Sequence, residues 1–337
     1  MALVTNERLG EAFSLALEDR SSGYQDLISN SNIVFSEMKA RGAWQAFSGP
    51  TIRERLLYNT SGTYTRYQGY QLLNPKPADL IADAEFEPKM AAVSVTISNE
   101  DILKNSGANQ LMSLFKVHLD AAEIELQNEF TVDLHSAGTA DNQIGGLQLA
   151  IPTTPSSGTY GGISRADNAV WRPLSFDVDT YAWQTPATQI SATTIKPIFN
   201  EVVIAASRGR KGPNLILSAQ EHFLAYSAAT EAIQRITDET RASKLGFTSL
   251  RYFGAGRSID IVLEGGQGSA MPSDVSYFID SDALKFRYHK DRNFSKIGGK
   301  MTPVNQDAIV QHIGFMGELT MNNPRHMAKL YDSDPAS

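Results

Sequence analysis

The chain has 337 residues, no cysteine, and a formal charge of −7 from 30 basic and 37 acidic side chains. The lack of cysteine excludes a disulfide framework, a thiolate metal site and a cysteine nucleophile. The acidic balance argues against a protein whose main task is to grip nucleic-acid phosphates, and 42% hydrophobic residues exclude whole-chain disorder. The length predicts about two domains. No stretch approaches about 18 uncharged apolar residues and no secretion signal is recognisable, so we expect no membrane span and folding in the cytosol.

The first forty residues predict one or two short amphipathic helices within 5–40. Leu9, Phe13 and Leu17 recur at a spacing of four. Their apolar surface is too small for an independent fold, so we expect this arm to lie on another surface.

Residues 51–71 and 84–97 predict two β-rich arms. The first is rich in threonine, tyrosine and arginine, which are typical of strands outside an aliphatic core. If the arms pair around 72–80, a ribbon of about 18–20 residues per arm reaches roughly 60 Å. That exceeds the roughly 50 Å diameter of a compact body, so such a ribbon would project. Its interface-type side chains are Arg53, Arg55, Tyr58, Tyr64, Arg66, Tyr67 and Tyr70. An ordinary edge hairpin covered by the arm is the alternative.

A long helix is predicted over 108–135, after a short helix capped by Ser98. Apolar residues fall at spacings of three and four along it and form one continuous stripe. The stripe consists of Leu111, Phe115, Leu119, Ala122, Leu126, Phe130 and Leu134. The opposite face is expected to be polar, with Lys116, Asp120, Glu123, Gln127 and Asp133. We call this long helix the spine helix. Its polar face is expected to be solvated or to contact a neighbour.

The remainder of the chain alternates short helices and strands after a loop-rich stretch at 138–179, the best candidate for a domain boundary. Helices are predicted near 193–207 and 220–236. Strands are predicted near 214–218, 250–253, 259–263, 275–279 and 284–289, with a turn at 254–257. This order indicates an α/β or α+β body. The tail, 306–330, holds a further strand, AIVQHIGFMGELTM, which we expect beside the spine helix.

No catalytic, cofactor-binding or metal-binding residue is predicted. The pairs Asp177/Asp179 and Asp280/Asp282 could hold a cation or act as acid and base, although turn capping is the favoured interpretation. Trp171 and Trp183 are interpreted as packing anchors for a loop rather than as a stacking platform. The six histidines show no ligand spacing. Two basic clusters suit intermolecular salt bridges as well as phosphate: Arg208, Arg210 and Lys211, and then Lys285, Arg287, Lys290, Arg292, Lys296 and Lys300.

An ordered series of segments resembles the major capsid proteins of tailed bacteriophages, built on the Hong Kong 97-type fold. The series begins with TYTRYQGYQLLN, ADAEFEPKMAAVSVTISNEDILKNSG and the spine helix that ends in DLHSAGT. It continues with NQIGGLQLAI, GTYGGISRADNAVWRP, NLILSAQEHFLAY, GFTSLRYFGAGRSIDIV and NQDAIVQHIGFMGELTMNNPRHMAKL. Together these segments cover about 49–332, and no single motif is diagnostic.

The resemblance implies an α+β fold divided into named parts. Residues 1–48 would be an N-terminal arm and 49–97 an extended β-hairpin loop over a neighbouring subunit. Residues 98–140, with the spine helix, and the C-terminal strands at 285–337 would form a peripheral domain. Residues 141–284 would form the axial domain. The candidate inter-subunit contacts are then Arg53, Arg55, Tyr58, Arg66, Tyr67, Tyr70 and Lys76. Lys76 could also form an isopeptide cross-link, but no catalytic acid and asparagine can be matched to it.

The implied function is mechanical and not enzymatic. Hexamers and pentamers would tile an icosahedral shell around double-stranded DNA, with a portal and decoration proteins as further partners. Assembly would occur in the bacterial cytoplasm, and the finished location would be the virion capsid. We expect a separate scaffolding protein, because only about 48 residues precede the ribbon and a fused scaffold needs about a hundred. An encapsulin-like shell around enzymes, or a hydrolase that uses Asp177 and Asp179, remain the alternatives.

Overall fold

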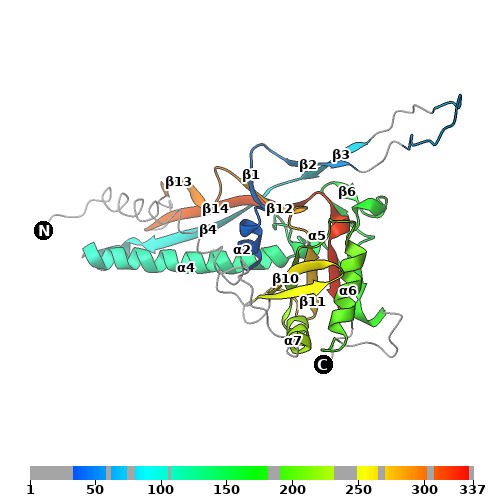
Figure 1. Ribbon diagram of the computed structural model, residues 1–337. Coiled ribbons are helices and arrows are strands. Elements are labelled where there is room, and N and C mark those ends of the chain that lie inside the picture. Colours follow the sequence, from blue (N-terminus) through cyan, green and yellow to red (C-terminus); the bar gives the residue numbers. More distant parts are fainter. Residues whose placement is uncertain are drawn as a thin grey trace.

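The computed structural model describes residues 33–57, 62–73, 80–104, 108–180, 190–230, 249–264, 270–301 and 307–333. Two mixed β-sheets, a long helix on one side and a projecting hairpin make up the molecule (Figure 1). The predicted mixture of helices and strands is therefore confirmed. Among the described residues, no helix is both long and apolar enough to cross a membrane.

The first sheet has five strands arranged around β14 (Ala308–Met321). One edge of β14 pairs antiparallel with β4 (Lys89–Ser98). The other edge pairs with β12 (Leu284–His289) and, further along, with β13 (Ser295–Met301). Strand β1 (Trp44–Phe47) adds to β12 in parallel. The strand predicted in the C-terminal tail is thus the centre of this sheet.

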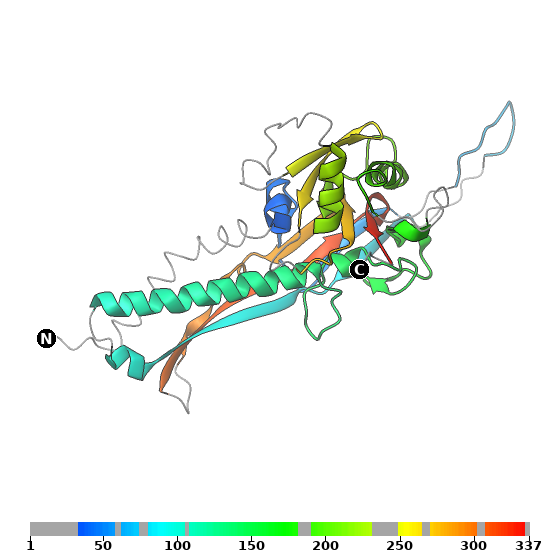
Figure 2. The ribbon, with the colours of Figure 1, turned by 90° about the horizontal axis from the view of Figure 1, so that it is seen from below.

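Helix α4 (Ala108–His135) runs along the first sheet beside β4 (Figure 2). Its bounds are those predicted from the apolar spacing. The described part of the stripe is buried, namely Leu119, Ala122, Leu126, Phe130 and Leu134. The short helix α3 (Asn99–Lys104) precedes it, and Ser98 Oγ accepts the Glu100 N–H at 3.1 Å, which confirms the predicted cap. The side chains of Leu111 and Phe115 lie outside the described residues.

The second sheet has six strands, in the order β7–β15–β11–β8–β10–β9. These strands are β7 (Leu174–Asp177), β15 (Ala328–Tyr331), β11 (Val275–Ile279), β8 (Leu215–Ser218), β10 (Arg257–Leu263) and β9 (Ser249–Gly254). Helices α6 (Ile195–Ala206) and α7 (Gln220–Thr230) pack on one face. The predicted turn between β9 and β10 is confirmed, with positive φ at Ala255 and Gly256.

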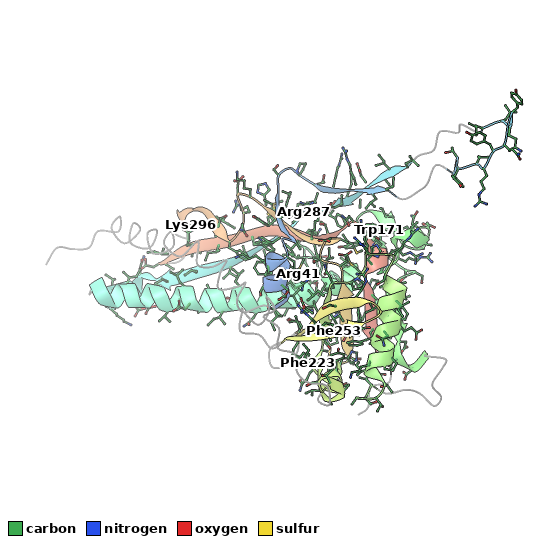
Figure 3. The ribbon with its side chains drawn as sticks, in the orientation of Figure 1. Arg41, Trp171, Phe223, Phe253, Arg287 and Lys296 are labelled. Atoms are coloured by element: carbon green, nitrogen blue, oxygen red, sulfur yellow. The ribbon has the colours of Figure 1, made fainter. Side chains whose placement is uncertain are left out.

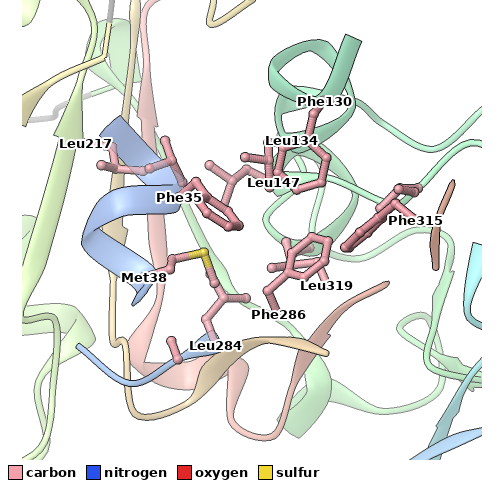
Figure 4. Close-up of a cluster of buried hydrophobic side chains, with 14 of the residues drawn as sticks. Phe35, Met38, Phe130, Leu134, Leu147, Leu217, Leu284, Phe286, Phe315 and Leu319 are labelled. Carbon is pink, nitrogen blue, oxygen red and sulfur yellow. The ribbon is translucent and has the colours of Figure 1, made fainter. Parts of the chain in front are cut away.

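Two hydrophobic cores meet at β8, which is buried along its whole length. Ile216 points into the core under α6, whereas Leu215 and Leu217 point into the core shared with α4 and the first sheet. Figure 4 shows the shared core around Leu217, Phe130 and Phe286. Because both faces are covered, β8 is a continuous apolar run with no polar alternation.

Helix α2 (Ile33–Ala40) and the residue after it join the two sheets. Phe35 packs edge-on against Phe130 of α4, with ring centroids 5.6 Å apart. Arg41 reaches the second sheet, where Nη2 lies 2.8 Å from Asp260 Oδ2 and Nη1 donates to the Asn214 carbonyl (Figure 3). The described end of the N-terminal arm therefore lies on the body, whereas Leu9, Phe13 and Leu17 lie outside the described residues.

The second predicted arm, 84–97, is corrected by the structure. It is two strands in different sheets, because Glu87 and Pro88 interrupt it. Strand β3 (Ile81–Phe86) pairs with β2 (Ile52–Leu57) over six residues, while β4 belongs to the first sheet.

The remaining elements are short. The loop-rich stretch and the C-terminal segment contain α5 (Leu147–Ala150), β5 (Thr159–Tyr160), β6 (Ile163–Ser164), and the 3-10 turns Ala169–Trp171, Val178–Thr180 and Pro324–His326. Strands β1, β5, β6, β7, β13 and β15 were not predicted.

Candidate assembly surfaces

The base of the projecting hairpin is a two-stranded ribbon of β2 and β3. Its side chains alternate, so Ile52 and Leu56 face the body while Arg53 and Arg55 face outward. Arg53 pairs with Glu85 across the ribbon at 2.9 Å, and both side chains are more than half exposed. This exposed pair contributes little to stability and leaves the outer face highly charged.

A buried ion pair anchors the hairpin to the first sheet. Glu54 points inward from β2, and its Oε1 accepts from Arg287 Nε at 2.8 Å and Nη2 at 2.7 Å. Arg287 Nη1 also donates to Gln45 Oε1 at 2.7 Å, and Thr320 donates to the Glu54 carboxylate (Figure 3). Strands β1, β2, β12 and β14 thereby share one polar network, which fixes the direction in which the hairpin leaves the body.

The end of the hairpin, residues 62–73, extends far beyond the body and has no regular strand (Figure 1). Large apolar side chains are exposed there, at 84% for Tyr64, 108% for Tyr70 and 96% for Leu72. Tyr67 and Leu73 are also exposed. Exposed aromatic residues concentrated on one projection are typical of a surface that another protein covers.

The predicted contact residues fall into two groups rather than one site. Arg53 and Arg55 lie on the outer face of the ribbon, whereas Arg66, Tyr67 and Tyr70 lie in the extended segment beyond it. Tyr58 and Lys76 lie outside the described residues.

Sequence reasoning missed Leu72 and Leu73 at the tip, although two leucines within a Tyr/Thr/Gln-rich stretch could have been recognised. It also missed the Glu54–Arg287 anchor. The alternation of Ile52, Glu54 and Leu56 is its sequence signal, because period two places this carboxylate on the inward face.

Glu318 of β14 is a second buried carboxylate, close to the point where α4 ends. It is 6% exposed, and its Oε1 accepts the Gly145 N–H at 2.8 Å. Burial raises the pKa of Glu318 to about 8, although hydrogen bonds from the Gly145 and Leu319 amides act in the opposite direction. The neutral acid therefore predominates in the folded protein near neutral pH.

The acidic pairs considered for catalysis cap turns. Asp177 Oδ1 accepts the Asp179 N–H at 3.3 Å, and Asp280 Oδ1 accepts the Asp282 N–H at 3.1 Å. Burial raises the pKa of Asp280. Nowhere in the described part of the chain do three or more histidine, aspartate or glutamate side chains gather as a metal site would require. The turn-capping interpretation is confirmed.

Trp171, one of the two tryptophans predicted as packing anchors, is confirmed in that role. Trp171 is buried, donates its indole N–H to the Tyr160 carbonyl at 2.9 Å and stacks near the Tyr160 ring. Trp183 lies outside the described residues.

The two basic clusters differ in exposure. Arg208, Arg210 and Lys211 are exposed on the turn that follows α6. In the second cluster Arg287 is committed to Glu54 inside the molecule, so the six cations do not form one patch.

Comparison of the sequence with known protein families and with curated proteins finds no match. Comparison of the fold with solved structures finds similar proteins. The chain is similar to a capsid asymmetric-unit structure of cyanophage A-1(L), with a TM-score of 0.62, 15% identity, and coverage of 88% of this chain and 92% of that one. It is similar to a structure from Mycobacterium phage Bobi, with a TM-score of 0.51, 10% identity and coverage of 87% and 90%. It is also similar to a procapsid structure of satellite phage P4 that includes a size determination protein, with a TM-score of 0.50, 8% identity and coverage of 94% and 92%.

These similarities extend over nearly the whole of each chain. At such low identity they show the fold. The chain has the α+β, Hong Kong 97-type fold of tailed-phage capsid proteins.

Proposed function

We propose that the protein is a major capsid protein whose copies associate as hexamers and pentamers into an icosahedral shell around double-stranded DNA. The observation that carries the proposal is the hairpin, which projects exposed tyrosine and leucine side chains far from the body on a charged, anchored base. A monomer gains nothing from such a projection. In a shell each copy can lay it over a neighbour, and many modest contacts become multivalent.

The parts of the molecule then have separate tasks. The hairpin within 49–97 crosses the seams between subunits, whereas α2 and β1 of the N-terminal arm, 1–48, hold that arm to the body. The parts around α4 and the first sheet form the peripheral domain, and the second sheet forms the axial domain near the symmetry axes. Strand β15 belongs structurally to the axial sheet, although it lies within 285–337.

A portal, decoration proteins and a separate scaffolding protein complete the proposed set of partners. The similarity to the P4 procapsid, which includes a size determination protein, supports a separate assembly partner. The shell would form in the bacterial cytoplasm and persist as the virion capsid.

Electron microscopy with analytical ultracentrifugation of the purified chain tests the shell function. Closed shells, or hexamers and pentamers, are expected; a protein that stays monomeric at every concentration would refute the proposal. A co-purifying enzyme inside small uniform shells would instead favour an encapsulin-like compartment.

Variants of the hairpin test the contact assignment. Tyr67→Ser/Tyr70→Ser and Arg55→Ala/Arg66→Ala should reduce shell yield while leaving the subunit folded. Tyr67→Phe/Tyr70→Phe keeps the apolar rings and should assemble normally. Equal yields from the serine and phenylalanine variants would show that the tip does not make the contacts.

A further inference from the structure

The spine helix α4 has a second apolar stripe on the face turned away from the sheet. Val117, Ala121, Ile124, Asn128 and Val132 follow one another at spacings of four, three, four and four, and all five are exposed. The exposed fractions are 61% for Val117, 56% for Ile124 and 46% for Val132. At about 100° per residue these positions share one face, opposite to the buried stripe. We call these five residues the outer stripe.

This face was expected to be polar, and the structure corrects that expectation. A helix that packs on one side of a globular protein normally presents charged and polar residues on the other. The outer stripe instead presents three β-branched apolar side chains over a length of about 22 Å. In the view from below, α4 lies in front of the first sheet (Figure 2). An exposed apolar stripe of this length, rimmed by polar groups, is typical of a protein-binding surface.

The rim of the outer stripe is acidic. Between residues 117 and 134 the sequence has five acidic residues and no lysine or arginine. Glu125 and Glu129, both exposed, follow each other at a spacing of four beside the stripe, and the partly buried Asp133 continues this row toward the sheet. Burial and, to a smaller extent, the negative charge of Glu129 raise the pKa of Asp133, against a hydrogen bond from Gln143 that lowers it. These carboxylates repel each other in the isolated subunit, and cations from a partner would relieve the repulsion.

We propose that the outer stripe binds an amphipathic α-helix of another protein, whose apolar face is flanked by lysine or arginine. The spacing of four, three, four and four matches the ridges of a packed helix, so a helix of about four turns would cover the stripe. The acidic rim selects a basic helix by charge complementarity and speeds its association. The inference stands independently of the shell function, because it concerns one face of one subunit.

Charge argues against the other occupants. A second copy of α4 would bring two acidic rims together. Residues 5–20 of this chain include four acidic and two basic residues, a net charge of −2, so the N-terminal arm of any copy is repelled as well. Nucleic acid is repelled for the same reason. A basic helix from a different protein is the occupant that satisfies both the apolar stripe and the rim.

Binding of two synthetic helices to the purified, unassembled full-length chain tests the proposal. Both fluorescent peptides have about 20 residues with leucines at spacings of three and four; one has lysine flanks and the other has glutamate flanks. Fluorescence anisotropy should give micromolar binding of the lysine peptide, weakened by added salt. The glutamate peptide should bind at least about tenfold more weakly. No binding of the lysine peptide, or equal binding of both peptides, would overturn the proposal.

Substitutions then locate the contact. Ile124→Asn should weaken lysine-peptide binding by about tenfold or more, because one buried isoleucine contact is lost. Ile124→Leu should bind like the wild type, which separates the apolar contact from a folding defect. Leu224→Asn removes an equally exposed apolar side chain from α7 and should change nothing.

Charge reversal provides the second arm of the test. Glu125→Lys/Glu129→Lys should weaken the lysine peptide and strengthen the glutamate peptide, which reverses the preference. Circular dichroism verifies that each variant is folded. An unchanged preference in the reversed variant, or unchanged affinity in Ile124→Asn, would contradict binding at the outer stripe.

Discussion

Replacement of Glu318 by glutamine should make the stability of the subunit less dependent on pH. Glu318 is buried within the first sheet and accepts a hydrogen bond from the Gly145 amide. Its pKa rises from the ordinary 4.5 to about 8, mainly because burial disfavours the carboxylate. The folded state thus holds this proton more tightly than the unfolded state. The stabilisation is fully present below about pH 4.5 and is lost as the pH rises toward about 8.

The size of the effect follows from linkage. One pKa unit corresponds to about 1.4 kcal/mol. Between about pH 5 and about pH 7 the unfolded carboxyl ionises while the folded one stays protonated, which costs about 2.5 kcal/mol of stability. Glutamine preserves the shape and the acceptor oxygen but cannot ionise. The free energy of unfolding of Glu318→Gln, relative to the wild type, should therefore rise by about 2.5 kcal/mol over this pH range.

Urea unfolding of unassembled subunits, followed by circular dichroism at both pH values, measures this difference. All other titrating groups are common to the two proteins and cancel. Glu87→Gln, at a carboxylate whose side chain is 82% exposed, is the control and should give a nearly constant difference. A constant difference for Glu318→Gln as well would refute the argument that burial controls the ionisation of this group.

Three further substitutions test contacts that connect separate elements of the fold, each by the midpoint of urea unfolding. Arg287→Ala leaves the Glu54 carboxylate buried without its cation and should cost about 3 kcal/mol; Arg287→Ala/Glu54→Gln should recover part of it, and a fully additive double variant would contradict the pairing. Gly146→Ala would place a Cβ within 2.3–2.6 Å of backbone atoms at the end of α4, and should lower stability by more than about 2 kcal/mol; a neutral effect would contradict that close approach. Arg41→Ala removes the 2.8 Å contact with Asp260 and should cost about 2 kcal/mol, while Arg41→Lys should recover little; an unaffected midpoint would show that this contact does not join the sheets.

Periodicity made most of the secondary structure predictable. The apolar stripe runs along nearly the whole of α4, a helix of 28 residues, so local spacing alone predicts this helix. Strand β14 was also predicted, although its side chains do not alternate between buried and exposed, because most of its length is buried on both faces. Strand β13, with sequence SKIGGKM, has two glycines and two lysines and is indistinguishable from a basic loop. It forms a strand because it pairs with the edge of β14, and this pairing cannot be predicted from the sequence of the segment itself.

The candidate surfaces were predictable only by residue type. Tyrosine and arginine in a β-rich stretch indicated an interface, and exposure of Tyr67 and Tyr70 agrees with that. Which cations are exposed could not be predicted, because Arg287 is committed to Glu54, a residue 233 positions away in the sequence. Two opposite charges so far apart in the sequence give no local indication that they form a pair.

Charged groups in this molecule fix orientation where apolar packing alone would not. Arg287 with Glu54 sets the exit of the hairpin, and Arg41 with Asp260 sets α2 against the second sheet. Apolar contacts are not directional, whereas a charge-assisted hydrogen bond requires one geometry. A chain without cysteine has no disulfide to fix the direction of this projection. The ion pair at the hairpin base supplies that direction, and in the proposed shell a neighbouring subunit would cover the exposed rings of the tip.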